Sequence, residues 1–203
     1  MEKLTIDEGR MLVKLARDSI ENSLHKKKEF EMRNVPESLM KNRGVFVTLY
    51  VDGELRSCVG YPKPVMRLLD ATVRAAAAAA FNDSRFPSIK EKDLANLRVE
   101  VTVLTPPEEI KTKERKDMKK EVIIGRHGLI AEYGPFSGLL LPQVPVEEGW
   151  DAETFLGQTC WKAGLSPSDW LNSKVKFYRF EGQIFAELKN GQVAEKKLML
   201  KSK

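Results

Sequence analysis

The stretch that decides the fold is GVFVTLYVDGELRSCVG, residues 44–60. Two runs rich in β-branched and aromatic residues flank the dipeptide Asp52-Gly53, which is a strong signal for a two-residue turn between antiparallel strands. The sequence therefore predicts a β-hairpin in the first half of the chain, and the remaining elements are read outward from it.

A two-residue turn also predicts the pairing of the two strands. It places Val47 opposite Cys58 and Leu49 opposite Arg56, so these four side chains are expected on one face of the hairpin. Ser57 is then expected on the other face. If the first face is buried, Cys58 is buried with it, and Arg56 has to reach an edge of the sheet or an anion. Arg56 either binds an anion or simply pairs with Glu100 or Glu54.

Helices and strands are expected around this hairpin. Thr5–Glu8 has the pattern of a capping box, and apolar residues follow it at helical spacing. A second helix is expected from Pro64 through the alanine run 75–80. Strict alternation predicts a strand at 97–104, and a further helix is expected from the cap Asp151 to Gly164.

The second half of the chain is expected to hold more hairpins. Residues 121–134 predict two short strands around Arg126–Gly128, and 174–188 predict a last pair that turns near Glu181-Gly182. Hairpins with helices between them, and no repeated βαβ pattern, indicate an α+β fold: a mainly antiparallel sheet flanked by helices.

Pro106-Pro107 breaks the strand pattern and suggests a second lobe. We expect residues 1–105 and 165–203 to form a larger α+β lobe and 106–164 to form a smaller lobe or insertion. The charged run 111–120 is either a solvated connection or exposed helix, or an anion-binding surface.

Composition excludes several classes of protein. The chain has 203 residues, of which 31% are charged, and a net charge of +5, which is typical of a globular protein and compatible with a thermophile. Two cysteines and two histidines give neither a disulfide framework nor a metal-ligand spacing, so no metal site is expected. No signal peptide and no membrane span are expected, and the expected location is the cytoplasm.

The candidate site centres on Cys58. A thiolate needs positive neighbours, which Arg56 supplies, and a catalytic cysteine needs a base, for which His127 is the candidate. Cys58 is alternatively a structural cysteine, or part of a non-covalent binding loop in which Gly60 permits close approach. No nucleotide, dinucleotide, hydrolase, metalloprotease or iron–sulfur motif is present, and no cofactor is expected.

Asp83 and Arg85 follow the alanine-rich helix and are expected to join this site. With Arg56, Ser57 and Gly60 they are the candidate ligand-binding residues, because guanidinium groups bind anionic ligands.

The block Leu55–Gly60 resembles the hallmark Leu-Arg-Gly-Cys-Ile-Gly of the AMMECR domain family. Ser57 replaces the family's glycine, and Val59 replaces its isoleucine. The hydroxymethyl group of Ser57 either narrows the space for a ligand or adds a hydrogen bond. The resemblance covers roughly residues 5–190, and the length is similar to that of stand-alone archaeal members. It continues through AAAAAAFNDSRFPSI, LRVEVTVLTPPEEI, IIGRHGLI, GLLLPQVPVEEGWDAETFLGQTCWKAGL and FYRFEGQIFAE.

The resemblance implies a two-lobed α+β fold with a cleft near the hallmark block, and it implies no reaction. Two functions fit these residues. The first is an inter-lobe cleft around Leu55–Gly60 that binds a small anionic ligand, with Cys58 as a possible reactive thiol. The second is a non-enzymatic protein that binds a protein partner or, weakly, nucleic acid. Enzyme status stays open, and a monomer or small homo-oligomer is expected.

Overall fold

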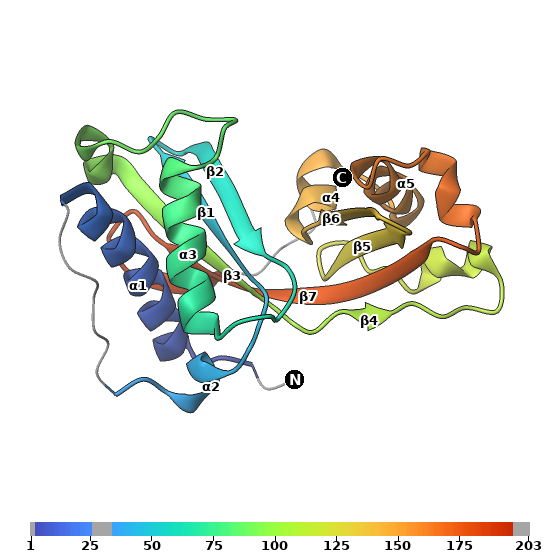
Figure 1. The fold of residues 1–203 in the computed structure, drawn as a ribbon, viewed down its shortest axis with the longest axis horizontal. Helices are drawn as coiled ribbons and strands as arrows, with labels where there is room; N and C mark the ends of the chain where they lie inside the picture. Colours follow the sequence, from blue (N-terminus) through green and yellow to red (C-terminus); the bar gives the residue numbers. More distant parts are fainter. Residues whose placement is uncertain (1–2, 26–33, 197–203) are drawn as a thin grey trace. The chain divides into compact units, whose positions relative to one another are not determined.

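The computed structural model describes residues 3–25 and 34–196 (Figure 1). They form two compact units: the described residues up to Leu104 together with Gln183–Lys196, and Thr105–Gly182. Each unit has its own cluster of buried apolar side chains. The expected lobes, 1–105 with 165–203 and 106–164, stay a prediction, and these compact units divide the chain after residues 104 and 182.

The first unit is an antiparallel sheet with two long helices. The strand order is β2-β1-β3-β7, and β8 also pairs with β7. Helices α1 and α3 pack side by side on one face of these strands (Figure 1). In chain order the elements of this unit are α1 (Ile6–His25), α2 (Glu37–Met40), β1 (Val45–Val51), β2 (Glu54–Tyr61), α3 (Leu68–Phe81), η1, a 3-10 helix (Glu91–Asn96), β3 (Leu97–Leu104), the last part of β7 (Lys176–Glu187) and β8 (Val193–Lys196).

The ends of the two long helices follow from local hydrogen bonds. Helix α1 begins as predicted: the Glu8 carboxylate accepts hydrogen bonds from the amide and the hydroxyl of Thr5. Helix α3 begins at Leu68 rather than at Pro64, because the Leu68 amide donates to the carbonyl of Lys41 at 3.0 Å and so joins a neighbouring segment. The buried alanines of α3 let the helices pack closely, since they have no side chain beyond Cβ.

The second unit is a smaller antiparallel sheet with short helices. The strand order is β7-β5-β6, and β4 also pairs with β7. Its elements are β4 (Glu108–Glu109), the 3-10 helix η2 (Arg115–Lys120), β5 (His127–Tyr133), β6 (Phe136–Leu140), α4 (Gln143–Glu148), α5 (Ala152–Lys162), the 3-10 helix η3 (Pro167–Leu171) and the first part of β7.

Two predicted hairpins in this half are wrong. Residues 122–126 form a turn that leads into a single strand, β5. Residues 176–187 form one long strand, β7, with no turn at Glu181-Gly182. The backbone stays extended there because Thr105 and Glu181 hold each other: the Thr105 amide donates to the Glu181 carbonyl at 2.9 Å, and the Glu181 amide donates to the Thr105 hydroxyl at 2.8 Å.

Helix α5 confirms its predicted start and end. The Asp151 carboxylate accepts a 2.8 Å hydrogen bond from the Thr154 amide, and Gly164, shortly after the helix, has φ of +80°. The antiparallel sheets and flanking helices confirm the predicted α+β class. None of the helices among the described residues is long and apolar enough to cross a membrane.

Candidate functional site

A bulge in the β1–β2 hairpin decides which residues of the block 55–60 face the helices. The first pairs after the turn keep the expected register, as far as Tyr50 with Leu55. The next pair is Leu49 with Ser57, so Arg56 is an extra residue on β2. The predicted pairing of Leu49 with Arg56 is therefore wrong.

The bulge exchanges the two faces of β2 beyond it. Cys58 pairs with Thr48, so the predicted pairing with Val47 is wrong and Cys58 lies on the face away from the helices. Ser57, expected on that outer face, shares the helix-covered face with Leu49 and is 1% exposed. The sequence therefore assigned Ser57 and Cys58 to the wrong faces.

Asp83 is the centre of the site on the first unit. Its carboxylate accepts a 2.8 Å hydrogen bond from the Ser57 hydroxyl. It also accepts from Nε and Nη2 of Arg85, at 2.9 and 2.8 Å. The second of these nitrogens continues to the carbonyl oxygen of Cys58 at 3.0 Å. These bonds, first of all those from Arg85, lower the pKa of Asp83 well below its ordinary value.

Arg56 reaches the same loop. Its Nε donates to the carbonyl oxygen of Pro87 at 3.1 Å. It forms no ion pair with any residue of the described ranges 3–25 and 34–196, whereas Glu100, one expected partner, is paired with Lys196 at 3.2 Å. The two guanidinium groups of Arg56 and Arg85 thus attach the loop after α3 to the edge strand β2.

Gly60 has a structural reason to be glycine. A Cβ atom there would overlap the carbonyl oxygen of Val45 and the backbone of Phe46 on β1. The space beside Gly60 is filled by strand β1. The group that approaches Gly60 closely is therefore the backbone of this chain and not a ligand.

The surroundings of the Cys58 thiol disfavour its ionised form. Its sulfur accepts a 3.3 Å hydrogen bond from the Thr48 hydroxyl. Burial raises the pKa of the thiol, against the opposing effects of the Thr48 hydrogen bond and the Arg85 charge. A raised pKa keeps the thiol protonated at neutral pH, and only the thiolate attacks.

His127 belongs to the second unit, at the start of β5. Its Nδ1 accepts a 3.1 Å hydrogen bond from the Ile123 amide and so holds the preceding turn. Burial, helped by the charges of Arg179 and Arg126, lowers the pKa of the imidazole, which is therefore neutral at pH 7. A catalytic role of His127 with Cys58 stays a prediction.

Among the candidate residues, the structure brings together Arg56, Ser57, Cys58, Asp83 and Arg85. Sequence reasoning missed Thr48, which contacts the thiol directly. Only the strand pairing could have indicated the contact of Thr48 with Cys58. A register without a bulge places Thr48 opposite Ser57 instead.

The lysine-rich run is partly paired with acids. Lys119 contacts Glu153 at 3.0 Å, and Lys120 contacts Asp117 at 2.6 Å. Arg115 is half-buried and donates to two carbonyl oxygens, those of Trp170 and Val175. Lys113 and Lys116 are exposed and form no ion pair with a residue of the described ranges. Part of the run is the 3-10 helix η2, and an anion-binding surface here stays a prediction.

Within the described ranges, no group of three or more His, Cys, Asp or Glu side chains is arranged to hold a metal ion. Cys160 is fully buried in the core of the second unit, and burial raises its pKa to about 12. It lies on the buried face of α5.

Several relatives of this chain are archaeal proteins of similar length. It is 50% identical over 202 residues to Protein MJ0810 of Methanocaldococcus jannaschii, covering 98% of this chain and 100% of that protein. It is 46% identical to Protein MK0488 of Methanopyrus kandleri, covering 97% of each. The crystal structure of the uncharacterized protein PH0010 from Pyrococcus horikoshii matches with a TM-score of 0.91 at 46% identity, over 97% of this chain and 100% of that one.

The family model AMMECR1 matches residues 13–185. This range contains the hallmark block and both residues of the Asp83–Arg85 pair. The match and the identities of the relatives agree with the resemblance seen in the sequence, and the chain belongs to the AMMECR1 family.

Proposed function

We propose that the edge of β2 in the first unit binds a small anionic ligand through Arg56 and Arg85, with Cys58 as a neutral thiol beneath the site. The observation that supports this most is the state of Arg85. Its side chain is 59% exposed, yet its orientation is fixed by Asp83, whose side chain is only 6% exposed.

Both arginines keep donors for a ligand. Arg85 uses Nε and Nη2 in its hydrogen bonds, and Nη1 donates to no described residue. Arg56 uses Nε alone, which leaves both of its terminal nitrogens. A guanidinium group binds carboxylates and phosphates through two parallel N–H bonds, so these free nitrogens suit an oxyanion.

The site is also preorganised. Ordering a long arginine side chain on binding costs roughly 0.5–1.5 kcal/mol. Arg85 is already held by the carboxylate of Asp83 and the carbonyl of Cys58, so less of this cost falls on the binding step. Asp83 cancels one positive charge, and the affinity expected for a simple anion is therefore modest.

The alternative is a non-enzymatic protein that binds a partner. In the second unit, Trp161 is 66% exposed and Phe136 is 48% exposed. Exposed tryptophan and phenylalanine are enriched at protein interfaces. This observation favours a protein partner.

The test is a titration of the 15N-labelled chain with inorganic phosphate, followed by NMR at the backbone amides of β2 and of the loop after α3. Arg56→Gln removes one guanidinium group without exposing the Asp83 carboxylate. It should weaken binding about three- to tenfold, the effect of losing an exposed charge-assisted hydrogen bond. Arg74→Gln is the matched control, since Arg74 is exposed on α3.

Saturable shifts at β2 that weaken in Arg56→Gln and not in Arg74→Gln support the proposal. Shifts that do not saturate, or that respond equally to both variants, reject it and leave the partner-binding alternative. That alternative is tested by the exchange of Trp161 to Ala in an affinity capture, with Leu171→Ala as a control at another exposed apolar residue of the same unit.

A further inference from the structure

A polar hollow lies at one end of the first unit's sheet, apart from the β2 edge. Its volume is about 600 Å³, enough for a small metabolite. Three connections form its wall: the β1–β2 turn at Asp52, the junction of η1 with β3, and the β7–β8 turn. We call it the sheet-end hollow. It is lined by Arg17, Asp52, Leu94, Ala95, Asn96, Leu97, Arg98, Glu187, Leu188, Lys189 and Gly191.

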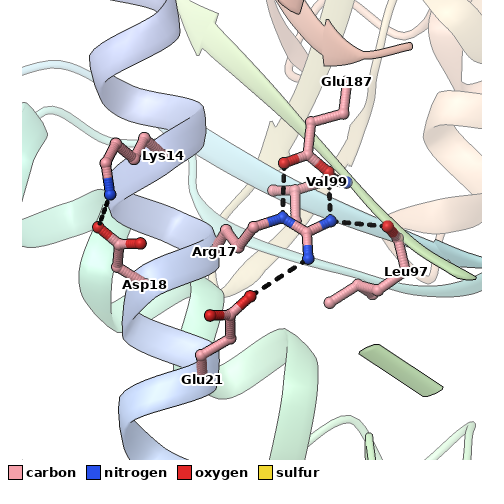
Figure 2. A network of polar contacts seen from close by, with 7 residues as sticks. All are labelled: Lys14, Arg17, Asp18, Glu21, Leu97, Val99 and Glu187. Carbon is pink, nitrogen blue, oxygen red and sulfur yellow. Dashed lines mark hydrogen bonds and ion pairs between the residues drawn. The ribbon is translucent and has the colours of Figure 1, made fainter. Parts of the chain in front are cut away.

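One wall of the sheet-end hollow is a satisfied ion pair (Figure 2). Arg17 donates from Nε and Nη2 to the two carboxylate oxygens of Glu187, at 2.7 and 2.6 Å. The same Nη2 donates to the carbonyl of Leu97 at 2.7 Å, and Glu187 accepts from the Val99 amide at 2.9 Å. The charges of Arg17 and Glu187 are thus satisfied within the protein, and the pair links α1, β3 and β7.

Two further cations line the sheet-end hollow without such partners. Arg98 is half-buried and Lys189 is exposed, and neither forms an ion pair with a residue of the described ranges. Lys189 sits on a defined turn, because the Leu188 amide donates to the Gln192 carbonyl at 2.8 Å and the Gly191 amide donates to the Leu188 carbonyl at 3.0 Å.

The acidic residues of the hollow compensate only part of this positive charge. Glu187 is neutralised by Arg17, and the remaining carboxylate is that of Asp52, which accepts a 2.6 Å hydrogen bond from Asn96. Three positive and two negative side chains line the hollow and leave one net positive charge. This charge belongs to Arg98 and Lys189, which have no ion-pair partner among the described residues.

We infer that the sheet-end hollow binds a small molecule through its oxyanion group, a phosphoryl or a carboxylate group, held between Arg98 and Lys189. This site is separate from the proposed β2 edge and does not depend on it. A hollow with a rigid wall, a net positive charge and two cations free to pair is suited to such a group.

The experiment uses the full chain labelled with 15N, titrated in separate series with inorganic phosphate and with sodium acetate at constant ionic strength. We expect saturable amide shifts at Asn96, Arg98 and Lys189. The double variant Arg98→Gln with Lys189→Gln should weaken binding about tenfold or more, as expected from the loss of two charge-assisted bonds at a partly exposed site.

The control is the double variant Arg74→Gln with Lys92→Gln, which lowers the net charge equally at exposed positions outside the hollow. The inference is upheld if the first double variant alone loses affinity, and the tighter probe then identifies phosphoryl or carboxylate as the preferred group. It is overturned if neither probe saturates or if both double variants weaken binding alike. The single variant Lys189→Gln gives the same decision if Arg98→Gln disturbs β3.

Failure here is distinguishable from failure of the β2-edge proposal. Arg56→Gln should leave the shifts at Asn96 and Lys189 unchanged, because Arg56 does not line the hollow. If Arg56→Gln abolishes these shifts, the hollow is not an independent site and the inference is wrong.

Discussion

Ser57 donates a 2.8 Å hydrogen bond to the nearly buried carboxylate of Asp83, and the same carboxylate holds Arg85 against the edge of β2. The hydroxyl at position 57, where the family hallmark has glycine, is therefore part of the connection between β2 and the loop after α3. It lies on the helix-covered face of the sheet and points away from solvent.

Ser57→Ala should lower the free energy of unfolding by about 1–2 kcal/mol, because it removes a hydrogen bond to a carboxylate that is nearly buried. Urea unfolding followed by circular dichroism measures this change. Ser23→Ala is the control, since the Ser23 hydroxyl bonds only to a carbonyl of its own exposed helix turn, and a change of less than about 0.5 kcal/mol is expected. Equal effects in both variants would contradict the role of Ser57.

The pKa of Asp83 is held below its ordinary value by Arg85 and Ser57, and this predicts a pH dependence of stability. A lowered pKa in the folded state stabilises the fold fully above the unfolded value of about 3.9, and the contribution is lost as the pH falls through the folded value. The wild-type advantage over Asp83→Asn in the free energy of unfolding should therefore be constant from pH 5 to 7 and shrink below pH 4 (about the unfolded pKa).

Urea unfolding of both proteins across this pH range measures that advantage. Asp7→Asn is the control, because Asp7 pairs with Arg10 on the exposed surface of α1, with side chains 81% and 56% exposed. A difference between wild type and Asp83→Asn that stays the same down to pH 3 (about one pH unit below the unfolded pKa) would show that Asp83 is not held ionised by its neighbours.

The turn of the β1–β2 hairpin could be read from Asp52-Gly53, since both residues adopt the positive φ values, +57° and +89°, that such a turn requires. The bulge at Arg56 could not be read. A bulge inserts one residue without changing the composition of the strand. Its position depends on how the two strands pair and pack in the folded protein. That single residue reversed the faces assigned to Ser57 and Cys58.

The other misreadings have the same origin in long-range contacts. Glu181-Gly182 has the composition of a turn, yet contacts with Thr105, far away in sequence, keep β7 extended. The sequence predicts that Gly60 leaves space for a ligand, whereas the backbone of β1 occupies this space. The residue types of the site were visible in the sequence, but which of their atoms meet is decided by strand pairing.

Cys58 should react slowly with iodoacetamide. Burial raises the thiol pKa, so the reaction midpoint should lie above the free-thiol value of about 8.5. Cys160, whose pKa burial raises to about 12, is an internal control that should stay unmodified until the protein unfolds. Mass spectrometry of each peptide from about pH 6 to 10 measures both rates.

Thr48→Val refines this measurement. The Thr48 hydroxyl donates to the sulfur and favours the thiolate, so its loss should move the midpoint of Cys58 to still higher pH. A midpoint near or below neutral pH in the wild-type protein would instead identify Cys58 as an activated thiol and favour the catalytic hypothesis.

Arg17 and Glu187 should contribute strongly to stability, in contrast to a second ion pair on the same helix (Figure 2). Their side chains are 24% and 11% exposed, and they join α1 to the end of β7. Arg17→Met leaves the carboxylate of Glu187 without its cation in a poorly hydrated place, which should cost about 3 kcal/mol. The Lys14–Asp18 pair is the internal comparison, because Lys14 is 66% exposed, whereas Asp18 is 18% exposed, and a pair with one exposed partner is expected to contribute about 0–1 kcal/mol.

A double-mutant cycle separates the pair from its surroundings. Arg17→Met, Glu187→Met and the combined variant are unfolded in urea, and the same cycle is made with Lys14→Met and Asp18→Met. We expect a coupling energy of about 2 kcal/mol or more for the first pair and below about 0.5 kcal/mol for the second. The combined variant should recover part of the loss of the single variants, because it leaves no unpaired charge, although the Val99 amide then lacks its acceptor. Similar coupling in the two cycles would mean that the Arg17–Glu187 pair behaves as an ordinary surface ion pair, and α1 would then be held to the sheet by its apolar face alone.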